Sequence, residues 1–96
     1  MSIDIGSYIV STPEIRHGRP RIAETGITVH RIAIWYKLGY TPEEIAYQYQ
    51  HLNLAQVYAA LAYYHANRNQ IDAEIAADEE EANRIEEEFL KTRKTA

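Results

Sequence analysis

Apolar residues near the start of the chain fall into two short extended segments. These segments, 8–12 and 20–23, are separated by prolines and a glycine, which interrupt regular structure. A two-stranded hairpin of this length is marginal in water by itself. We therefore expect residues 1–28 to form an arm that pairs either within itself or with the arm of a second subunit.

From Val29 onward the apolar positions follow the period of an α-helix. The first helix is predicted at 29–38, and Gly39 ends it because glycine adopts the positive φ found beyond helix C-termini. The run Thr41-Pro42-Glu43-Glu44 combines a capping threonine, a proline at the first helical position and a glutamate three residues after the cap. A second helix is therefore predicted to begin there.

A third helix is predicted from the repeat of this capping pattern. Asn53 is followed three residues later by Gln56, and the helix should run to about Asn67. One stripe of it is expected to be buried, comprising Leu54, Val57, Leu61 and Tyr64. Three helices with short connections are typical of the helix-turn-helix domain. We expect residues 29–68 to form such a tri-helical domain, although the same plan occurs in domains that do not touch nucleic acid.

Residues 69–96 are rich in alanine and glutamate and contain no glycine or proline, so a long C-terminal helix is predicted. Its apolar positions form a narrow, heptad-like edge: Ile71, Ile75, Ala82, Ile85 and Phe89. An edge this thin is not expected to lie in the chain's own core, so the helix should pair with a partner or stay frayed. The fold class is therefore mainly α, with a short β arm or hairpin before the helices.

The chain is small and has no cysteine. A single domain of 96 residues buries only about 60 to 65 per cent of its unfolded surface, and neither disulfides nor thiolate metal sites can add stability. We therefore expect a homodimer. No stretch approaches the roughly 20 apolar residues of a membrane span, and the first ten residues do not resemble a signal peptide. We expect a cytoplasmic protein that does not contact membranes.

The net charge of −4 is unevenly distributed along the chain. Residues 1–68 carry six basic and five acidic side chains, a balance of +1, whereas residues 69–96 carry nine acidic and four basic ones, a balance of −5. Nearly all the negative charge therefore lies on the predicted tail helix. Two surfaces of different character suggest two different partners.

Four stretches of the chain together resemble domain-of-unknown-function family 433. They are Gly18-Arg-Pro-Arg-Ile-Ala23, Ile27-Thr-Val29, Leu38-Gly-Tyr-Thr-Pro-Glu-Glu-Ile45 and the run from Tyr49 to Tyr64. The resemblance implies a homeodomain-like fold. It also implies an antitoxin encoded beside a PIN-like ribonuclease toxin, which would neutralise that toxin and repress its own operon by binding operator DNA.

Two groups of residues are candidates for binding DNA. The arm places Arg16, His17, Arg19 and Arg21 within six residues, as an arm that follows phosphates or enters a minor groove would. These could equally be solvated residues on a dimer surface. The third helix would present Ala55, Gln56, Ala59, Tyr63 and Asn67 outward, with Gln56 and Tyr63 as the DNA-binding candidates. None of these residues is cationic, and phosphate attraction normally dominates affinity for DNA. We therefore favour the interpretation in which Gln56 caps its own helix and Tyr63 packs at a dimer contact.

The tail is the candidate for binding a protein. Its acidic surface could occupy the basic groove of a ribonuclease toxin, with Ile71, Ile75, Ile85 and Phe89 as apolar anchors. The alternative is a solvated helix end.

Nothing in the sequence indicates catalysis or a metal site. The eight tyrosines recur largely at helical spacing, which favours packing in the core and at a subunit interface. The four histidines have no i, i+4 spacing and no nearby cysteine. We expect a protein without enzymatic activity, cofactor or metal. The two functions left are an antitoxin and a protein–protein adaptor that does not bind DNA.

Overall fold

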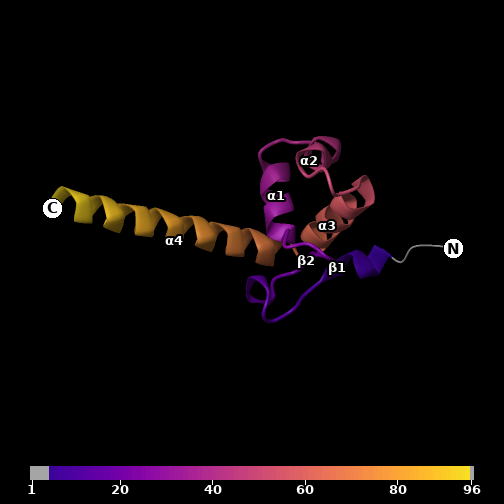
Figure 1. Ribbon diagram of the computed structural model, residues 1–96, viewed down its shortest axis with the longest axis horizontal. Helices are drawn as coiled ribbons and strands as arrows, with labels where there is room; N and C mark the ends of the chain where they lie inside the picture. Colours follow the sequence, from indigo (N-terminus) through magenta and orange to yellow (C-terminus); the bar gives the residue numbers. More distant parts are fainter. Residues whose placement is uncertain (1–4, 96) are drawn as a thin grey trace.

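The computed structural model describes residues 5–95; residues 1–4 and 96, at the ends of the predicted arm and tail, lie outside the described residues. The fold is mainly helical, with a short N-terminal hairpin and a long C-terminal helix (Figure 1), as the sequence predicts. Its elements in chain order are η1 (Ile5–Tyr8), β1 (Ile9–Val10), η2 (Arg16–Gly18), β2 (Arg21–Ile22), α1 (Val29–Lys37), α2 (Pro42–Gln48), α3 (Leu54–Ala66) and α4 (Arg68–Thr95).

The arm pairs within itself, which was one of the two expected arrangements. β1 and β2 are antiparallel, and Ile9 lies opposite Ile22. The hairpin is stabilised by the helices because η1, β1 and β2 all pack against α3. This packing also explains a wrong prediction: Ala59 was expected on the outer face of α3 but is only 6% exposed.

The helix starts follow the predicted capping logic. Thr41 accepts a hydrogen bond from the Glu44 backbone N–H at 3.1 Å, and the Glu44 carboxylate accepts one from the Thr41 N–H at 2.9 Å. Asn53 and Gln56 form the same reciprocal pair at the start of α3. Each box satisfies two backbone donors that a helix N-terminus otherwise leaves unpaired. Gly39, with φ +102°, follows α1 in the left-handed region.

The core lies where α1, α2 and α3 meet, and it includes the first turns of α4. Its buried residues are Ile22, Val29, Ile32, Ala33, Ile45, Leu52, Val57, Ala60, Leu61, Tyr64, Ile71 and Ile75. The expectation that the tail's apolar edge lies outside the core is therefore wrong for Ile71 and Ile75. Only Asn67 separates α3 from α4, so the first turns of α4 stay against α1 and α3. Leu54, expected in the buried stripe, is 42% exposed at the first position of α3.

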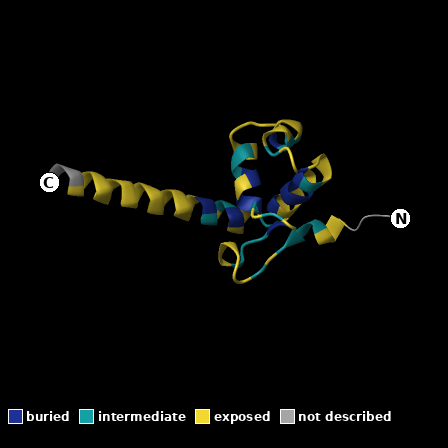
Figure 2. Cartoon of the chain, viewed as in Figure 1, coloured by how far each residue is buried: buried dark blue, intermediate teal, exposed yellow. Residues whose placement is uncertain are grey.

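Beyond Ile75, α4 leaves the rest of the molecule. The described side chains from 76 to 92 are all exposed, and Figure 2 shows this half of the helix projecting from the buried base. The longest axis of the molecule is 63 Å, against 29 and 25 Å for the other two. Within the described residues, no helix has the length and apolar character needed to cross a membrane.

Candidate functional site

Three carboxylates hold the base of α4 to three other parts of the fold. Asp72 accepts a hydrogen bond from the Tyr64 hydroxyl at 2.8 Å and forms an ion pair with Lys37 at 3.2 Å. The hydroxyl and then the ammonium of Lys37 lower the pKa of the Asp72 carboxyl, while burial and the same hydrogen bond raise the pKa of Tyr64. This contact connects α4 to the ends of α1 and α3.

The other two carboxylates connect α4 to the start of α1 and to the arm. The Glu74 carboxylate lies 2.9 Å from Nε2 of His30, whose side chain is almost fully buried. Asp78 receives two hydrogen bonds from the Arg19 guanidinium, at 2.6 and 3.1 Å. This bidentate contact lowers the pKa of Asp78 and raises that of Arg19. The direction in which α4 projects is therefore set by contacts with α1, α3 and the arm.

The basic turn of the arm has an unusual backbone. Arg16, His17 and Gly18 all have positive φ, at 51°, 57° and 76°. Left-handed backbone costs about 1 kcal/mol or more for a residue with a side chain, so the surrounding structure must hold this turn in place. One such contact is the hydrogen bond from Arg16 Nε to the Gly26 carbonyl at 3.1 Å. A Cβ at Gly26 would lie 3.2 Å from the Arg16 guanidinium, so glycine there allows the close approach.

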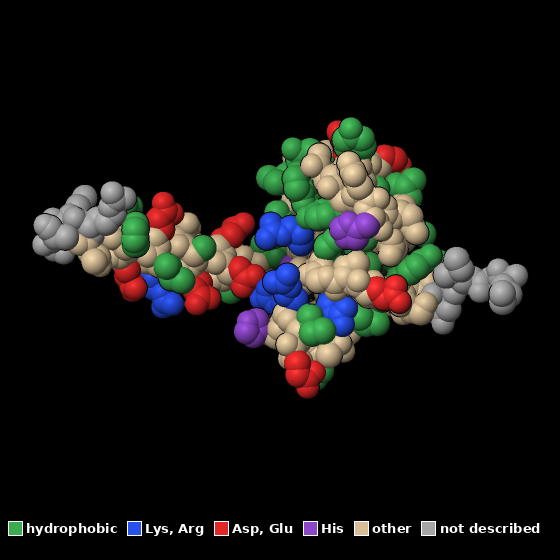
Figure 3. Space-filling model, in the orientation of Figure 1, with side chains coloured by type: hydrophobic (Ala, Val, Ile, Leu, Met, Phe, Trp, Pro, Cys, Tyr) green, Lys and Arg blue, Asp and Glu red, His purple; other side chains and the backbone are tan. Residues whose placement is uncertain are grey.

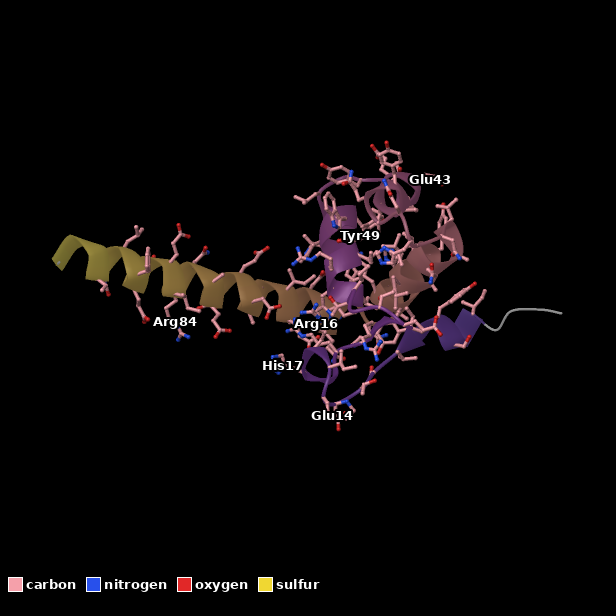
Figure 4. All side chains as sticks on the ribbon, viewed as in Figure 1. Glu14, Arg16, His17, Glu43, Tyr49 and Arg84 are labelled. Atoms are coloured by element: carbon pink, nitrogen blue, oxygen red, sulfur yellow. The ribbon has the colours of Figure 1, made fainter. Side chains whose placement is uncertain are left out.

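A pocket of about 390 Å³ lies between this turn, the start of α1 and the end of α2. Its lining residues are Arg16, His17, Arg19, Gly26, Ile27, Thr28, Arg31 and Tyr49. Figure 3 shows Lys and Arg side chains gathered where the helical domain meets the base of α4. Figure 4 places Arg16 and His17 on the arm close to that base, with Tyr49 on the helical domain. The sequence predicted the arm cations of this pocket but not Arg31, which is far enough along the chain that only the fold brings it to them.

Arg21, the fourth predicted cation of the arm, does not share this surface. It is only 9% exposed, and its guanidinium donates to the Thr25 carbonyl at 3.0 Å and to the Thr12 hydroxyl at 2.9 Å. A buried guanidinium with these partners stabilises the arm's internal turns. In this conformation Arg21 is not available to contact a ligand, which corrects its place among the predicted surface cations.

The outer face of α3 carries little charge, as the sequence predicted. The Gln56 side chain belongs to the capping box, so the capping role proposed for it is confirmed. Tyr63 is 37% exposed and lies with His17 and Arg19 around a second pocket of about 130 Å³. Its predicted contact with DNA stays a prediction.

The projecting half of α4 combines acidic and apolar side chains. Ile85, Phe89 and Leu90 are each about half exposed or more, and Figure 3 shows acidic side chains along the same helix. Of the four predicted anchors, Ile85 and Phe89 are on the surface, whereas Ile71 and Ile75 are in the core. Leu90 was missed because it lies one position outside the heptad pattern that defined the edge.

The tyrosines differ in their surroundings. Tyr64 is buried, and the Tyr49 hydroxyl accepts a hydrogen bond from the Trp35 indole at 2.9 Å. Tyr47, by contrast, is 80% exposed and Tyr58 is 50% exposed. Core packing thus explains only some of the tyrosines. Among the residues that the structure describes, no three His, Cys, Asp or Glu side chains are grouped as a metal site would need.

Two comparisons with known proteins match this chain to the same family. A family model described as "Protein of unknown function (DUF433)" matches residues 9–64. The crystal structure of a DUF433 member protein from Anabaena variabilis is similar to this chain, with a TM-score of 0.68 and 34% sequence identity. That similarity covers 73% of this chain and 69% of the other. No curated protein matches the chain. The family match includes all the cations of the 390 Å³ pocket, whereas α4 follows it.

Proposed function

The chain belongs to the DUF433 family of proteins of unknown function, and from this starting point we propose that it is the antitoxin of a bacterial type II toxin–antitoxin pair. The projecting half of α4 binds and neutralises a PIN-like ribonuclease toxin. The arm and helical domain bind operator DNA. The chain acts as a homodimer, without enzymatic activity.

The observation that carries this proposal is the projecting half of α4. Residues 76 to 92 cover no part of the chain's own core, whereas most helical stability in proteins comes from packing of an apolar face against other elements. A helix that keeps Ile85, Phe89 and Leu90 exposed without contributing to the fold is well suited to dock in a groove of another protein.

The charge of this helix favours one class of partner. Residues 78–81 and 86–88 are all acidic. A nuclease must attract RNA phosphates, so its substrate groove is basic. An acidic helix with an apolar edge matches such a groove in charge, and by occupying it the helix would also exclude the RNA substrate.

The proposed DNA contact rests on the arm rather than on α3. Arg16 and His17 are exposed on the arm turn, whereas α3 contains no lysine or arginine. Because phosphate attraction supplies most non-specific affinity for DNA, the arm is the better candidate for the first contact.

Co-expression with the protein encoded beside this chain's gene tests the toxin half of the proposal. We expect a small nuclease there that co-purifies with the full chain. Replacing Ile85, Phe89 and Leu90 together by serine should abolish co-purification while leaving the helical domain folded. A matched control replaces Ala76 and Ala77, which lie on the same projecting half but outside the apolar edge, by serine.

The partner proposal fails if the neighbouring protein is not a nuclease. It also fails if the apolar variant binds that nuclease as well as the control does. The folded state of each variant is checked by the fluorescence of Trp35, which lies far along the chain from α4.

Binding of the chain to a duplex from its own upstream region tests the DNA half. Fluorescence anisotropy should show affinity that falls as salt rises, with a slope set by the number of phosphates neutralised. Absence of DNA binding at low salt would contradict only the proposed DNA contact, because co-purification with the nuclease does not depend on DNA binding.

A protein–protein adaptor is the second candidate function. It is favoured by the neutral exposed face of α3 and by the packing of the arm on that helix, which restricts access of α3 to a DNA groove. An adaptor would bind its protein partner through α4 but show no salt-dependent binding to DNA. The anisotropy measurement therefore separates the two candidates.

A further inference from the structure

The ionisable side chains that line the 390 Å³ pocket are mostly basic. Three arginines and one histidine line it, and among the described residues no carboxylate is part of its lining. This is a marked local imbalance in a chain whose net charge is −4. Cations that converge on a hollow from separate elements create a positive potential that favours an anion.

The cations of this pocket differ in how far they are already engaged. Arg19 forms an ion pair with Asp78 of α4, and the Arg16 Nε–H donates a hydrogen bond to the Gly26 carbonyl. The Arg31 side chain is exposed and has no hydrogen bond or ion pair within the described part of the chain. Arg31 is therefore the cation of the pocket that is most available to a ligand.

The positions of these groups are fixed by the backbone on both sides. On one side, the left-handed turn at Arg16 and His17 is held by the contact with Gly26. On the other side, Thr28 caps α1 by accepting a hydrogen bond from the Arg31 N–H at 3.1 Å. Ile27 and Thr28 also line the pocket, so the positive end of the α1 dipole adds to the charge of the side chains.

We propose that this pocket binds a phosphodiester of duplex DNA, with Arg31 as the principal ligand and Arg16 and His17 beside it. Guanidinium groups bind phosphate oxygens through paired hydrogen bonds. The inference rests on the proposed function, which it deepens by adding Arg31 on α1 to the arm residues. It makes the DNA contact a composite surface of arm and helix rather than a flexible arm alone.

The Arg19–Asp78 contact supports this assignment. A carboxylate bound to a guanidinium at 2.6 and 3.1 Å occupies the same donors that a phosphate oxygen pair would use. Asp78 therefore neutralises the edge of the pocket nearest α4, and the uncompensated charge is left toward Arg31. The phosphate is expected on the Arg31 side.

Replacement of Arg31 by alanine tests the proposal in the full chain. The matched control is Arg84→Ala, which removes the same charge from the projecting half of α4, away from Arg16 and His17 (Figure 4). Anisotropy with the upstream duplex should show affinity about tenfold lower for R31A at low salt, and a salt slope smaller by about 0.9. R84A should bind with an affinity within about twofold of that of the unaltered chain, because the lost charge lies away from the pocket and is screened by salt.

The outcomes separate this inference from the proposed function. If the unaltered chain does not bind duplex DNA, the DNA half of the proposed function fails and this inference fails with it. If the unaltered chain binds but R31A matches R84A in affinity and slope, the pocket assignment alone is overturned. Lys37, which is paired with Asp72, offers a further control, since K37A should leave the salt slope unchanged.

A second measurement distinguishes a DNA phosphodiester from a free anion. Inorganic phosphate is titrated into the protein while the backbone amides of residues 27–31 are followed by NMR. We expect weak, millimolar shifts at these amides that are lost in R31A, together with much tighter binding of the duplex. Tight binding of inorganic phosphate that the duplex cannot displace would overturn the assignment to DNA. Unchanged amide spectra in R31A outside α1 and the arm establish that this variant is folded.

Discussion

At the scale of single residues, the contact between Arg19 and Asp78 connects the two proposed functions. Arg19 belongs to the basic turn of the arm, whereas Asp78 lies where α4 begins to project. While the pair is intact, one cation of the arm is neutralised by the acidic helix. In the proposed function, DNA phosphates and α4 would therefore compete for the same guanidinium.

Replacement of Asp78 by asparagine should strengthen DNA binding. The change frees the charge of Arg19, so we expect a several-fold higher affinity at low salt and a salt slope larger by about 0.9. Glu79→Gln is the matched control. Glu79 is exposed, and this substitution removes an equal charge from the position next to Asp78. Equal effects of the two changes would show that only the net charge of α4 matters and that the specific contact does not.

Asp72 gives a prediction about pH. Its folded-state pKa lies below the ordinary value because of the Tyr64 hydroxyl and the Lys37 ammonium, so its contribution to stability is present above pH about 4. That contribution is lost as the pH falls through the lowered pKa and the carboxylate is protonated. The difference in thermal midpoint between the unaltered chain and D72N should therefore shrink as the pH is lowered from 6 through the lowered pKa of Asp72. A difference that stays constant across this range would contradict the account.

The same scale shows what the sequence can and cannot predict about a site. Arg16, Arg19 and Arg21 look equivalent in the sequence, yet one is exposed, one is paired with Asp78 and one is buried. Arg16 donates to the Gly26 carbonyl and Arg19 to the Asp78 carboxylate, whereas Arg21 donates to the Thr12 hydroxyl and the Thr25 carbonyl. Local pattern identifies which residues are cationic, but only tertiary contacts decide which cations remain available to a ligand.

At the scale of elements, the base of α4 is part of the domain. Ile71 and Ile75 are 2% and 4% exposed, so α4 continues the core for two turns before it projects. This divides the helix into a structural part and an exposed part, and the boundary lies just after Ile75.

This division predicts that the same substitution has effects of very different size on the two parts. Ile71→Ala should lower the free energy of unfolding by about 2 to 5 kcal/mol, because it leaves a cavity in the core. Ile85→Ala, on the exposed part, should change it by less than about 0.5 kcal/mol. Urea denaturation followed by circular dichroism measures both.

If I71A does not fold, Ile71→Val provides a milder test, with an expected loss of about 0.5 to 1.5 kcal/mol. Similar stability of the Ile71 and Ile85 variants would mean that α4 does not dock on the domain in solution.

The elements were largely predictable from the sequence because their signals are local. The two capping boxes and Gly39 mark helix boundaries through contacts within a few residues. Three of the errors, at Ala59, Ile71 and Ile75, depend on which element packs against which. The arm that covers α3 and the single-residue connection between α3 and α4 are tertiary features that periodicity does not encode.

At the scale of the whole molecule, the basic and the acidic surfaces lie at different places along the long axis. The basic pocket lies on the helical domain beside the base of α4, and the acidic half of α4 extends away from it (Figure 3). The residues that match the family model end at Tyr64, before α4 begins. The proposed DNA-binding surface therefore lies within the region shared with relatives, whereas the proposed partner-binding helix follows that region.

This separation would allow both proposed partners to bind at once, except at Arg19 and Asp78. Engagement of the projecting helix by a toxin would bring a basic groove next to Asp78. Basic side chains of that groove would compete with Arg19 for the Asp78 carboxylate, and Arg19 would then be available to DNA. The toxin is therefore expected to stimulate operator binding by breaking one ion pair, between Arg19 and Asp78.

The central claim, that the projecting half of α4 neutralises a nuclease, is tested most directly by titrating the purified neighbouring nuclease with this chain and measuring RNA cleavage. We predict that cleavage is lost near equimolar chain, and that the variant with serine in place of Ile85, Phe89 and Leu90 leaves it intact at the same concentration. Full cleavage in the presence of excess unaltered chain, or equal inhibition by that variant, would contradict the claim.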